Sequence, residues 1–403
     1  MRQVTCDVIV VGAGPAGSAA AILLAEYGHS VLLLDKAAFP RPKICGEYLS
    51  PEASRILDRL GVLKTVDAAA VPLRGMRITV PDGTVLAGRY PTEGPYRGYR
   101  DHALAISRLG LDQILVERVK ALPVDVRERH RVEDLLVEGD RVVGVRAVGP
   151  DGVALDVRSP LVVGADGRQS LVARRLDLME AHPLRRMALI AYVEGVDDFG
   201  DSGEIYVDPP DYAILNPVAA GVVSLSLVVP LAHAAPFSGR LETFFHARLK
   251  QLDRLRPRIA AMRPLGPVMA LGPLAYRVRP PRHAGVLLVG DAAGFYDPFT
   301  GEGIYTALRS AELAAEIAHG ALARGNCSQA ALAPYWRARR DAFRDKERVT
   351  RILQAVIARR WLANLVARRL ARRPDLLSLL MGVIGDFIPP RALLSPRLLL
   401  GRR

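Results

Sequence analysis

The residues Gly12-Ala13-Gly14-Pro15-Ala16-Gly17 decide the fold. A short apolar run, Asp7–Val11, stands before them, and an Ala- and Leu-rich stretch that starts at Pro15 and stops at Gly28 follows. A short continuous apolar run is typical of a parallel strand that is buried on both faces. Proline at the start and glycine at the end predict a helix between them. We therefore expect a strand, a tight glycine turn and a helix.

The three glycines of this GxGxxG motif have separate physical roles. Gly12 permits the tight turn, Gly14 lets the backbone approach a pyrophosphate, and Gly17 lets the helix pack close to the strand. The first helical turn begins with Pro15 and Ala16, and its N–H groups present the positive end of the helix dipole to the phosphates. The motif therefore predicts a dinucleotide site.

An acidic residue completes the motif at the next strand. The run Ser30–Leu34 ends at Asp35, which lies about 20 residues beyond the glycine motif, as ribose binding requires. A carboxylate at this position accepts both hydroxyls of an adenosine ribose and repels a 2′-phosphate, so FAD or NAD is favoured over NADP. We assign the adjacent Lys36 to the same site.

Two later segments repeat the pattern of an apolar strand that ends in glycine and an acid. They are Leu161–Asp166 and Val286–Asp291, and they predict that one sheet is assembled from distant parts of the chain. Gly167 and Arg168 follow the first segment as a tight turn with an arginine available for phosphate. Asp291 offers a carboxylate to a sugar-chain hydroxyl.

A further glycine turn narrows the choice of cofactor. Gly301-Glu302-Gly303-Ile304 comes shortly after Pro298 and opens a helix whose N–H groups point at an electron-rich ring. A nicotinamide needs no second and third site of this kind, whereas a flavin on a ribityl arm does. Together the three strand ends predict FAD.

The segments between these strands predict a second sheet. Gly75–Arg89 and the stretch from Arg185 to about Pro230 alternate and turn as antiparallel strands do. The uncharged stretch 212–239 is long enough to span a bilayer. Because Asn216-Pro217 and Gly221 interrupt it, we expect two buried strands joined by a turn.

The expected fold is α/β, with a Rossmann-like FAD-binding domain, an interleaved antiparallel β-sheet substrate domain and a helical C-terminal region. Tyr305–Gly320 and most of Ala331–Arg369 are predicted helices. The FAD-binding domain is expected over 1–74, 96–180 and 276–335. The substrate domain is expected over 75–95 and 181–275, and the basic helical region over 336–403.

Composition excludes several functional classes. Half of the 403 residues are apolar and 24% are charged, which excludes a disordered chain and a coiled coil. Cys6, Cys45 and Cys327 lie far apart without a CxxC pair, so neither a disulfide scaffold nor a zinc ribbon is expected, and a reducing, cytoplasmic compartment is favoured. The eight histidines contain no His-x-x-x-His pair, and no metal site is predicted.

Three motifs together resemble a known family: GAGPAG (12–17), GADGRQS (164–170) and GDAAGFYDPFTGEGIYTAL (290–308). They are similar to flavoproteins of the p-hydroxybenzoate hydroxylase-like fold, and specifically to the geranylgeranyl reductase family, over about residues 1–320. The resemblance implies an FAD-dependent oxidoreductase that transfers hydride between the flavin and a C=C bond of an apolar substrate, such as a polyprenyl, quinone or polyketide-derived lipid. Aromatic hydroxylases of this fold usually carry GDAAH and then GQG followed by Asn, whereas Gly294, Glu302 and Tyr305 here are similar to the reductases.

The resemblance also implies roles for individual residues. Asp35 would hold the adenosine ribose, Asp291 the ribityl chain, Arg108 a phosphate, and Gly301–Ile304 the isoalloxazine edge. For Arg108 an ordinary surface arginine is the alternative. The full set of expected cofactor-binding residues is Gly12, Gly14, Pro15, Ala16, Gly17, Asp35, Lys36, Cys45, Gly46, Arg108, Asp166, Gly167, Asp291, Pro298, Gly301, Gly303 and Ile304.

Two further segments suggest the reactive and substrate-binding residues. The segment 41–46 resembles the family's Lys-x-x-Cys-Gly sequence near the flavin, so Cys45 is a candidate acid for a substrate carbanion or a wall of the cavity; a small buried residue is the alternative. The segment 209–217 resembles the family's Pro-x-x-Tyr-x-Trp-x-Phe-Pro, with an aliphatic residue and an amide in place of two aromatics, which widens the substrate class beyond geranylgeranyl chains. Tyr212 is a candidate catalytic residue or a core aromatic. The expected substrate-binding residues are Tyr212, Ile214, Asn216 and Pro217.

Three activities remain open from the sequence. They are a reductase or dehydrogenase of an apolar substrate, an FAD-dependent monooxygenase of an aromatic or lipid substrate, and a non-redox cyclase or a halogenase. Phe39-Pro-Arg41 followed by Gly46-Glu47 is similar to the halogenases, but their Trp-x-Trp-x-x-Pro segment is missing. NAD(P)H, ferredoxin and a quinol remain open as the electron donor.

Positive charge gathers at the C-terminal end. Residues 351–403 contain eleven arginines against two acids, in a chain of net charge +13. One alternative is peripheral contact with the inner face of the membrane, with Leu376–Ile388 lying in the interface. The other is a solvated helical face. Nucleic acid is not expected, because aromatic residues are few and no reader motif is present.

Overall fold

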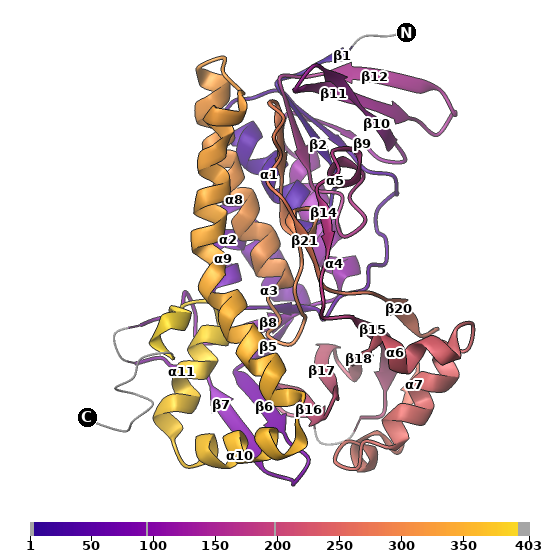
Figure 1. Ribbon diagram of the computed structural model, residues 1–403, viewed down its shortest axis with the longest axis vertical. Coiled ribbons are helices and arrows are strands. Elements are labelled where there is room, and N and C mark those ends of the chain that lie inside the picture. Colours follow the sequence, from indigo (N-terminus) through magenta and orange to yellow (C-terminus); the bar gives the residue numbers. More distant parts are fainter. Residues whose placement is uncertain (1–3, 94–95, 197–198, 394–403) are drawn as a thin grey trace.

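The computed structural model describes residues 4–93, 96–196 and 199–393. A parallel sheet with its helices lies above a large antiparallel sheet in the view of Figure 1, and the long helix α9 (Gln329–Ile357) runs alongside both. The predicted fold class is confirmed. The C-terminal part of the predicted basic tail, 394–403, lies outside the described residues.

The parallel sheet has five strands in the order β22-β13-β2-β3-β9. All neighbouring pairs are parallel, so the carboxyl ends of the strands share one edge. Segments nearly 300 residues apart therefore meet at that edge, as the repeated strand ends predicted. The strands are Val286–Leu288 (β22), Leu161–Gly164 (β13), Val8–Val11 (β2), Val31–Leu34 (β3) and Val124–Arg127 (β9).

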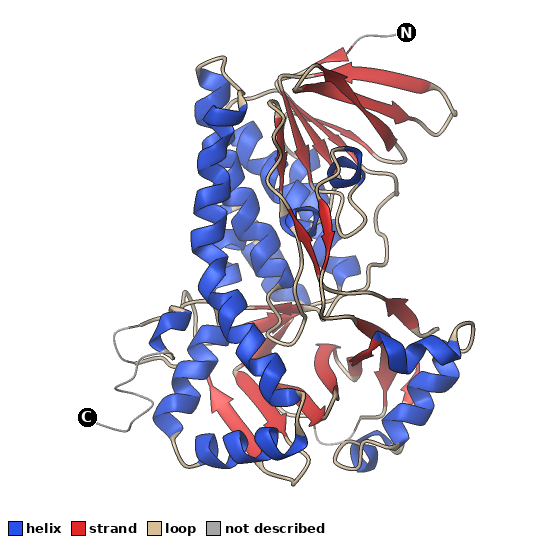
Figure 2. Cartoon of the chain, viewed as in Figure 1, coloured by secondary structure: helices blue, strands red, loops and turns tan. Residues whose placement is uncertain are grey.

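Helices cover one side of the parallel sheet and a second sheet lies at its other side (Figure 2). Side chains of the five strands alternate between these two layers. One set packs against the helices α1 (Pro15–Glu26), α4 (Arg108–Lys120) and α8 (Gly303–Ala323). The other set packs against a four-stranded sheet in the order β1-β12-β11-β10. The strands of that sheet are Val4–Thr5 (β1), Ala154–Arg158 (β12), Arg141–Val148 (β11) and Arg131–Glu138 (β10).

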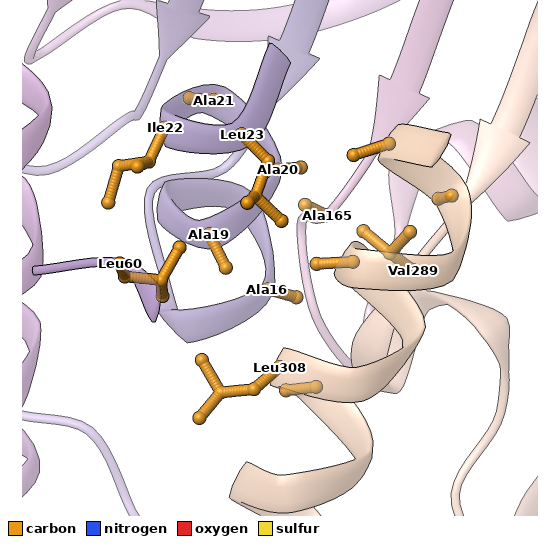
Figure 3. Packing of buried hydrophobic residues seen from close by; sticks show 14 of the residues in the cluster. Ala16, Ala19, Ala20, Ala21, Ile22, Leu23, Leu60, Ala165, Val289 and Leu308 are labelled. Atoms are coloured by element: carbon orange, nitrogen blue, oxygen red, sulfur yellow. The ribbon is translucent and has the colours of Figure 1, made fainter. Parts of the chain in front are cut away.

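Helix α1 fits between its neighbours because its inward side chains are small. Ala16, Ala19 and Ala20 are buried and lie close to Leu308 of α8 and to Ala165, which follows β13 (Figure 3). Alanine contacts let helix and strand backbones approach closely, and apolar burial stabilises the unit by about 25 cal/mol per Å². The glycine motif is thereby fixed at the sheet edge.

The antiparallel sheet has eight strands in the order β19-β15-β18-β17-β16-β6-β7, with β20 beside β15. Its β16–β6 pair, which joins the two segments of the predicted substrate domain, is parallel. The uncharged stretch forms the hairpin β17–β18, so the prediction of two buried strands is confirmed. No helix in the described part of the chain is long and apolar enough to cross a bilayer. The strands are Arg263–Pro264 (β19), Arg186–Glu194 (β15), Val222–Pro230 (β18), Asp211–Ala219 (β17), Ser202–Asp208 (β16), Gly75–Thr79 (β6), Val85–Arg89 (β7) and Met269–Leu271 (β20).

Smaller elements connect the two sheets. The three-stranded sheet β4-β8-β5 lies between them, and β14 pairs with β21. These strands are Tyr48–Leu49 (β4), Ala103–Ala105 (β8), Val71–Leu73 (β5), Met179–Ala181 (β14) and Tyr276–Val278 (β21). The remaining α-helices before α8 are Pro51–Arg59 (α2), Leu63–Ala69 (α3), Leu171–Arg175 (α5), Leu231–Ala234 (α6) and Leu241–Lys250 (α7).

The C-terminal region is helical, as predicted, but its apolar helix is not available to a membrane. The helix α11 (Pro374–Ile384) buries Leu377, Leu380 and Met381 in the core cluster on one face of the antiparallel sheet. The placement of Leu376–Ile388 in a membrane interface was therefore wrong, because this protein covers the apolar face itself. The predicted run Ala331–Arg369 is also divided, into α9 and α10 (Arg360–Ala371).

Candidate functional site

The glycine turn brings two strand ends into contact. Gly12 has a φ of +100°, and a Cβ there would lie 2.6 Å from the carbonyl oxygen of Ala165. A Cβ on Gly17 would lie 1.7 Å from the carbonyl oxygen of Gly12. Neither position has room for a side chain, so the motif holds α1 tightly against β2 and the end of β13.

The remaining glycine of the motif, Gly14, faces open space lined by two cationic side chains. A Cβ on Gly14 would lie 3.7 Å from a guanidinium nitrogen of Arg108 and 3.8 Å from one of Arg41. Gly14 is also the N-cap of α1, where no side chain satisfies the first N–H groups of the helix. Two guanidinium groups and a bare helix N-terminus are donors that suit a diphosphate, so the residues present fit FAD.

Asp35 fastens the glycine turn to the end of β3. Its carboxylate accepts hydrogen bonds from the backbone N–H of Ala13 at 2.8 Å and of Ala37 at 2.9 Å, and Arg41 lies 3.5 Å away. A carboxylate has about four acceptor positions, so it retains capacity for ribose hydroxyls. Ribose binding by Asp35 remains a prediction. The adjacent Lys36 is exposed, and no hydrogen bond or ion pair joins it to the described residues.

Arg108 is a buried part of the site and not a surface arginine. Its side chain makes a two-pronged ion pair with Asp112, at 2.7 and 2.8 Å, one turn further along α4. Arg41 lies 3.5 Å from the same carboxylate. These pairs fix the two guanidinium groups beside Gly14. The role of Arg108 in phosphate binding remains a prediction, which this position supports.

Asp291 stands at the end of β22 without a hydrogen-bond partner on its carboxylate among the described residues. Burial raises the pKa of its carboxyl group, and Arg108 and Lys43 oppose that rise. Burial also lowers the pKa of the Lys43 ammonium, and Arg108 adds to the effect. The Asp291 carboxylate can still accept hydrogen bonds and lies near cationic side chains. It therefore suits a hydroxyl of a sugar chain, as predicted.

The acid that follows β13, Asp166, makes its hydrogen bonds within the fold. Asp166 accepts hydrogen bonds from the backbone N–H groups of Leu171 and Val172, at 2.6 and 3.4 Å, and so caps α5. Phosphate binding by Arg168 remains a prediction, and part of its guanidinium group is already engaged. Its guanidinium group donates to the carbonyl oxygens of Leu274 and Pro273.

The turn before α8 rests on a buried polar junction. Asp297 accepts hydrogen bonds from the hydroxyl of Tyr212, the backbone of Phe299 and the amide of Gln354, at 2.6–2.9 Å. Burial raises the pKa of Asp297 to about 6. The junction joins the antiparallel sheet, the turn and helix α9.

The residues predicted at this turn surround the start of α8. Pro298, Gly301 and Gly303 are partly exposed, and Ile304 is buried in the core of the parallel sheet. A Cβ on Gly301 would lie 2.6 Å from the ring of Tyr48, so the turn passes close to β4. Flavin contact by these residues remains a prediction.

Tyr212 is placed differently from what a substrate donor requires. It is fully buried, and its hydroxyl is already bonded to Asp297. Its ring packs edge-on against Phe299 at 5.1 Å. The alternative of a core aromatic with a satisfied hydroxyl describes this position, and a catalytic role for Tyr212 remains only a prediction.

Cys45 lies in a turn that contacts the antiparallel sheet. The carbonyl oxygen of Gly46 accepts a hydrogen bond from the amide of Asn216 at 2.7 Å. The Cys45 side chain is partly exposed, and burial raises the pKa of its thiol while Arg108 lowers it. Gly46 has no atom within 4 Å of a hypothetical Cβ, so its side of the turn is open.

Three of the four predicted substrate residues share one sheet face. Tyr212, Ile214 and Asn216 alternate along β17 toward the side that carries the Cys45 turn. Pro217 lies on the opposite face by the same alternation. Contact between these residues and substrate remains a prediction.

A cavity of about 400 Å³ lies apart from these residues, between α2, the start of α8 and the end of α11. Its charges are largely paired, because Arg55 binds Glu52 and Glu312 and Arg309 also binds Glu312. Surface pairing of this kind leaves little net field for a ligand.

A protein-family model described as "FAD binding domain" matches residues 5–350. The chain belongs to this family of FAD-binding flavoproteins. The flavoprotein is an enzyme with FAD as its cofactor, and the resemblance drawn from the three motifs is confirmed.

Relatives of the flavoprotein include different activities. Digeranylgeranylglycerophospholipid reductase 2 of Methanopyrus kandleri is 31% identical over 336 residues, which cover 82% of this chain and 81% of the relative. Kynurenine 3-monooxygenase of Salinispora arenicola is 32% identical over 327 residues, covering 74% and 69%. The solved structure of a myxobacterial FAD-dependent chondrochloren halogenase has a TM-score of 0.80 at 26% identity, covering 86% and 82%.

Several residues of the site were not identified from the sequence. Arg41, Lys43, Glu47 and Tyr192 join it through contacts between distant segments. The first three lie in or beside the Lys-x-x-Cys-Gly segment, which was the available signal. Tyr192 had none, because an aromatic residue in a strand is usually part of the core.

Proposed function

We propose that this flavoprotein is a reductase that adds hydrogen to a carbon–carbon double bond of an apolar substrate. The observation that carries the proposal is the contact of the Cys45 turn with a sheet face that includes the apolar residues Ile190, Ile214 and Val228. The name of the Methanopyrus relative, a reductase of a prenylated lipid, supports the same chemistry.

The chain's own residues position the reaction and keep it dry. When bound, FAD supplies the hydride. Arg41 and Arg108 would bind its diphosphate, and Asp35 and Asp291 would accept hydrogen bonds from its hydroxyl groups. The apolar sheet face excludes water from the reacting carbons, and the Cys45 thiol, whose pKa burial raises, holds a proton at neutral pH.

The test is an anaerobic incubation of the holoprotein, reduced with dithionite, with prenylated lipids. Mass spectrometry is expected to find product with two added hydrogen atoms and no added oxygen. Dithionite makes the assay independent of whether NAD(P)H, ferredoxin or a quinol is the natural donor. Product that forms only in air and carries a new oxygen atom would contradict the proposal.

Oxygen-dependent chemistry is the second candidate, and it is supported by the monooxygenase and halogenase relatives. A monooxygenase would insert one oxygen atom into an aromatic or lipid substrate. A halogenase would require both air and a halide. The same incubation, repeated in air with and without bromide, separates these outcomes from reduction.

We further propose that helix α10 contacts anionic lipid. Trp361 and Leu365 are 65% and 43% exposed, although both are large and apolar. The exposed Arg369 and Arg372 follow on the same helix and at its end, without a charged partner among the described residues. An apolar stripe beside arginines suits the surface of an anionic membrane, where substrate lipids reside.

A further inference from the structure

Lys346, near the middle of helix α9, has its side chain inside the protein. It is 6% exposed, and burial lowers the pKa of its ammonium group while the nearby Glu302 opposes the change. A buried ammonium group keeps its charge only beside carboxylates, because a buried charge without a partner is costly. The groups around Lys346 therefore decide what it does.

Two carboxylates and an aromatic ring surround the Lys346 ammonium group. Its Nζ forms an ion pair with Asp386 and lies 3.6 Å from Oε1 of Glu302. Nζ is also 5.8 Å from the centre of the Tyr305 ring, within the range of a cation–π interaction. Lys346 thus joins α9 to the segment after α11 and to the start of α8.

Asp386 is the fixed partner in this cluster. Its side chain is 1% exposed, and its φ of +70° is uncommon for a residue other than glycine. Its backbone N–H donates to the carbonyl oxygen of Val383 at 3.2 Å, which ties it to the end of α11. Lys346 therefore has an anchor that does not depend on Glu302.

Glu302 is the N-cap residue of α8, but its side chain does not cap the helix. It makes no hydrogen bond to the first N–H groups, whereas a serine side chain caps each of α2, α4, α5 and α9. A carboxylate at this position is attracted to the positive end of the helix dipole. Oε1 of Glu302 is instead buried near Lys346, without a hydrogen-bond partner among the described residues. The ion pair with Lys346 is therefore the contact that holds this carboxylate.

This arrangement leaves the first N–H groups of α8 without a side-chain cap. They belong to Gly303 and Ile304, which are predicted to lie at the isoalloxazine edge of FAD. Reduction places negative charge on a flavin, and helix N–H groups stabilise such charge. A carboxylate over the same N–H groups would occupy these donors and repel the charge. The position of the Glu302 side chain therefore affects how readily the cofactor is reduced.

We propose that Lys346 is a positioning residue for FAD, which holds Glu302 away from the N-terminus of α8 and leaves the N–H groups there for the flavin ring. The proposal rests on the predicted contact between this turn and the flavin. It does not depend on which reaction the enzyme catalyses. Its tests therefore need no substrate, and they stay decisive if the reductase function fails.

Redox titration of the holoprotein without substrate measures the effect. Lys346→Met removes the charge from a side chain of similar length, so Glu302 is released and is expected to cap α8. The midpoint potential of bound FAD is expected to become more negative. FAD is expected to leave the protein about tenfold faster, in line with the usual strength of a charge at a helix end. An unchanged potential in Lys346→Met would overturn the proposal.

Glu302→Gln, added to Lys346→Met, is the decisive variant. Its amide carries no charge to oppose reduction, so the potential and the release rate are expected to return to near the wild-type values. Lys346→Met with Asp386→Asn is the matched control, because it makes the same change of net charge on the other partner of the lysine, and it is expected to keep the altered values. Equal recovery with Asp386→Asn would show that net charge alone acts, and recovery with neither would show that Lys346 only supports the fold. Either result would overturn the proposal.

Circular dichroism checks that each variant is folded. If Lys346→Met alone does not fold because Asp386 loses its partner, the comparison is made in Lys346→Met with Asp386→Asn, which removes the buried pair as a whole. Adding Glu302→Gln to that protein is expected to raise the midpoint potential and to slow the release of FAD. Unchanged values would overturn the proposal.

Discussion

At the residue scale, Asp297 links the protonation of a single group to folding. Its carboxylate accepts three hydrogen bonds through one oxygen, and the other oxygen is buried without a partner among the described residues. Ionisation of Asp297 therefore costs free energy in the folded protein. That cost has a measurable dependence on pH.

The free energy of unfolding is expected to fall as pH rises from about 4 to about 6. Burial raises the pKa of Asp297 from 3.8 to about 6 in the folded protein. Between these two pH values the folded protein holds a proton that the unfolded chain has already lost. The resulting stabilisation is complete below about pH 4 and is lost as the pH rises through about 6. The loss amounts to at most about 3 kcal/mol. Urea unfolding of the wild type and Asp297→Asn across this range measures it. A difference in the free energy of unfolding between wild type and Asp297→Asn that does not change over this pH range would contradict the raised pKa of Asp297.

Gly17→Ala tests the closest approach in the molecule. The added methyl group would lie 1.7 Å from the carbonyl oxygen of Gly12, so the turn must move. We expect FAD to be lost on gel filtration and stability to fall by roughly 1–3 kcal/mol, the usual cost of overpacking. Gly266→Ala is the matched control, because it is exposed with nothing within 4 Å. Retention of FAD by Gly17→Ala would refute the tight-turn explanation.

Motif residues were predictable, whereas residues recruited across the fold were not. The spacing of Gly12, Gly14 and Gly17 has a local physical cause, so the sequence alone indicated their close contacts. Glu47 and Tyr192 meet only because β15 passes beneath the Cys45 turn. A pattern along one segment holds no information on such a meeting.

At the element scale, helix α11 belongs to the core. Its apolar side chains pack against one face of the antiparallel sheet, although the run of leucines suggested an interfacial helix. Hydrophobic periodicity shows that a face must be covered and does not show what covers it. By contrast, proline and glycine inside 212–239 identified the β17–β18 hairpin, because a membrane helix tolerates that pattern poorly.

Leu380→Ala is expected to lower the free energy of unfolding by about 2–5 kcal/mol, because it leaves a cavity between α11 and the sheet. Leu365→Ala, on the exposed side of α10, is the control and is expected to change it by under about 0.5 kcal/mol. Urea unfolding without lipid measures both. Equal, small effects would mean that α11 is not part of the folded core.

At the scale of the whole molecule, positive charge is concentrated at one end of the long helix α9. Figure 1 shows α10 and α11 together at the lower end, far from the start of α9. The exposed Trp361 lies there as well. In the proposed membrane contact, the end of the molecule that carries α10 would face the membrane.

Arg369→Glu with Arg372→Glu is expected to weaken sedimentation with anionic liposomes by at least about tenfold, since each arginine near the surface contributes on the order of 1 kcal/mol. Arg324→Glu with Arg337→Glu makes the same change of charge near the other end of α9 and is expected to leave binding intact. Neutral liposomes are expected to bind weakly throughout. Equal loss from both pairs would indicate that net charge alone, and not α10, governs binding.

The most direct measurement is anaerobic stopped-flow absorbance of the reduced holoprotein after mixing with a prenylated lipid. If the Cys45 turn and the apolar sheet present a double bond to reduced FAD, the flavin absorbance will return without oxygen, in proportion to the saturated lipid formed. If the flavin stays reduced until air is admitted, direct reduction of the lipid is contradicted.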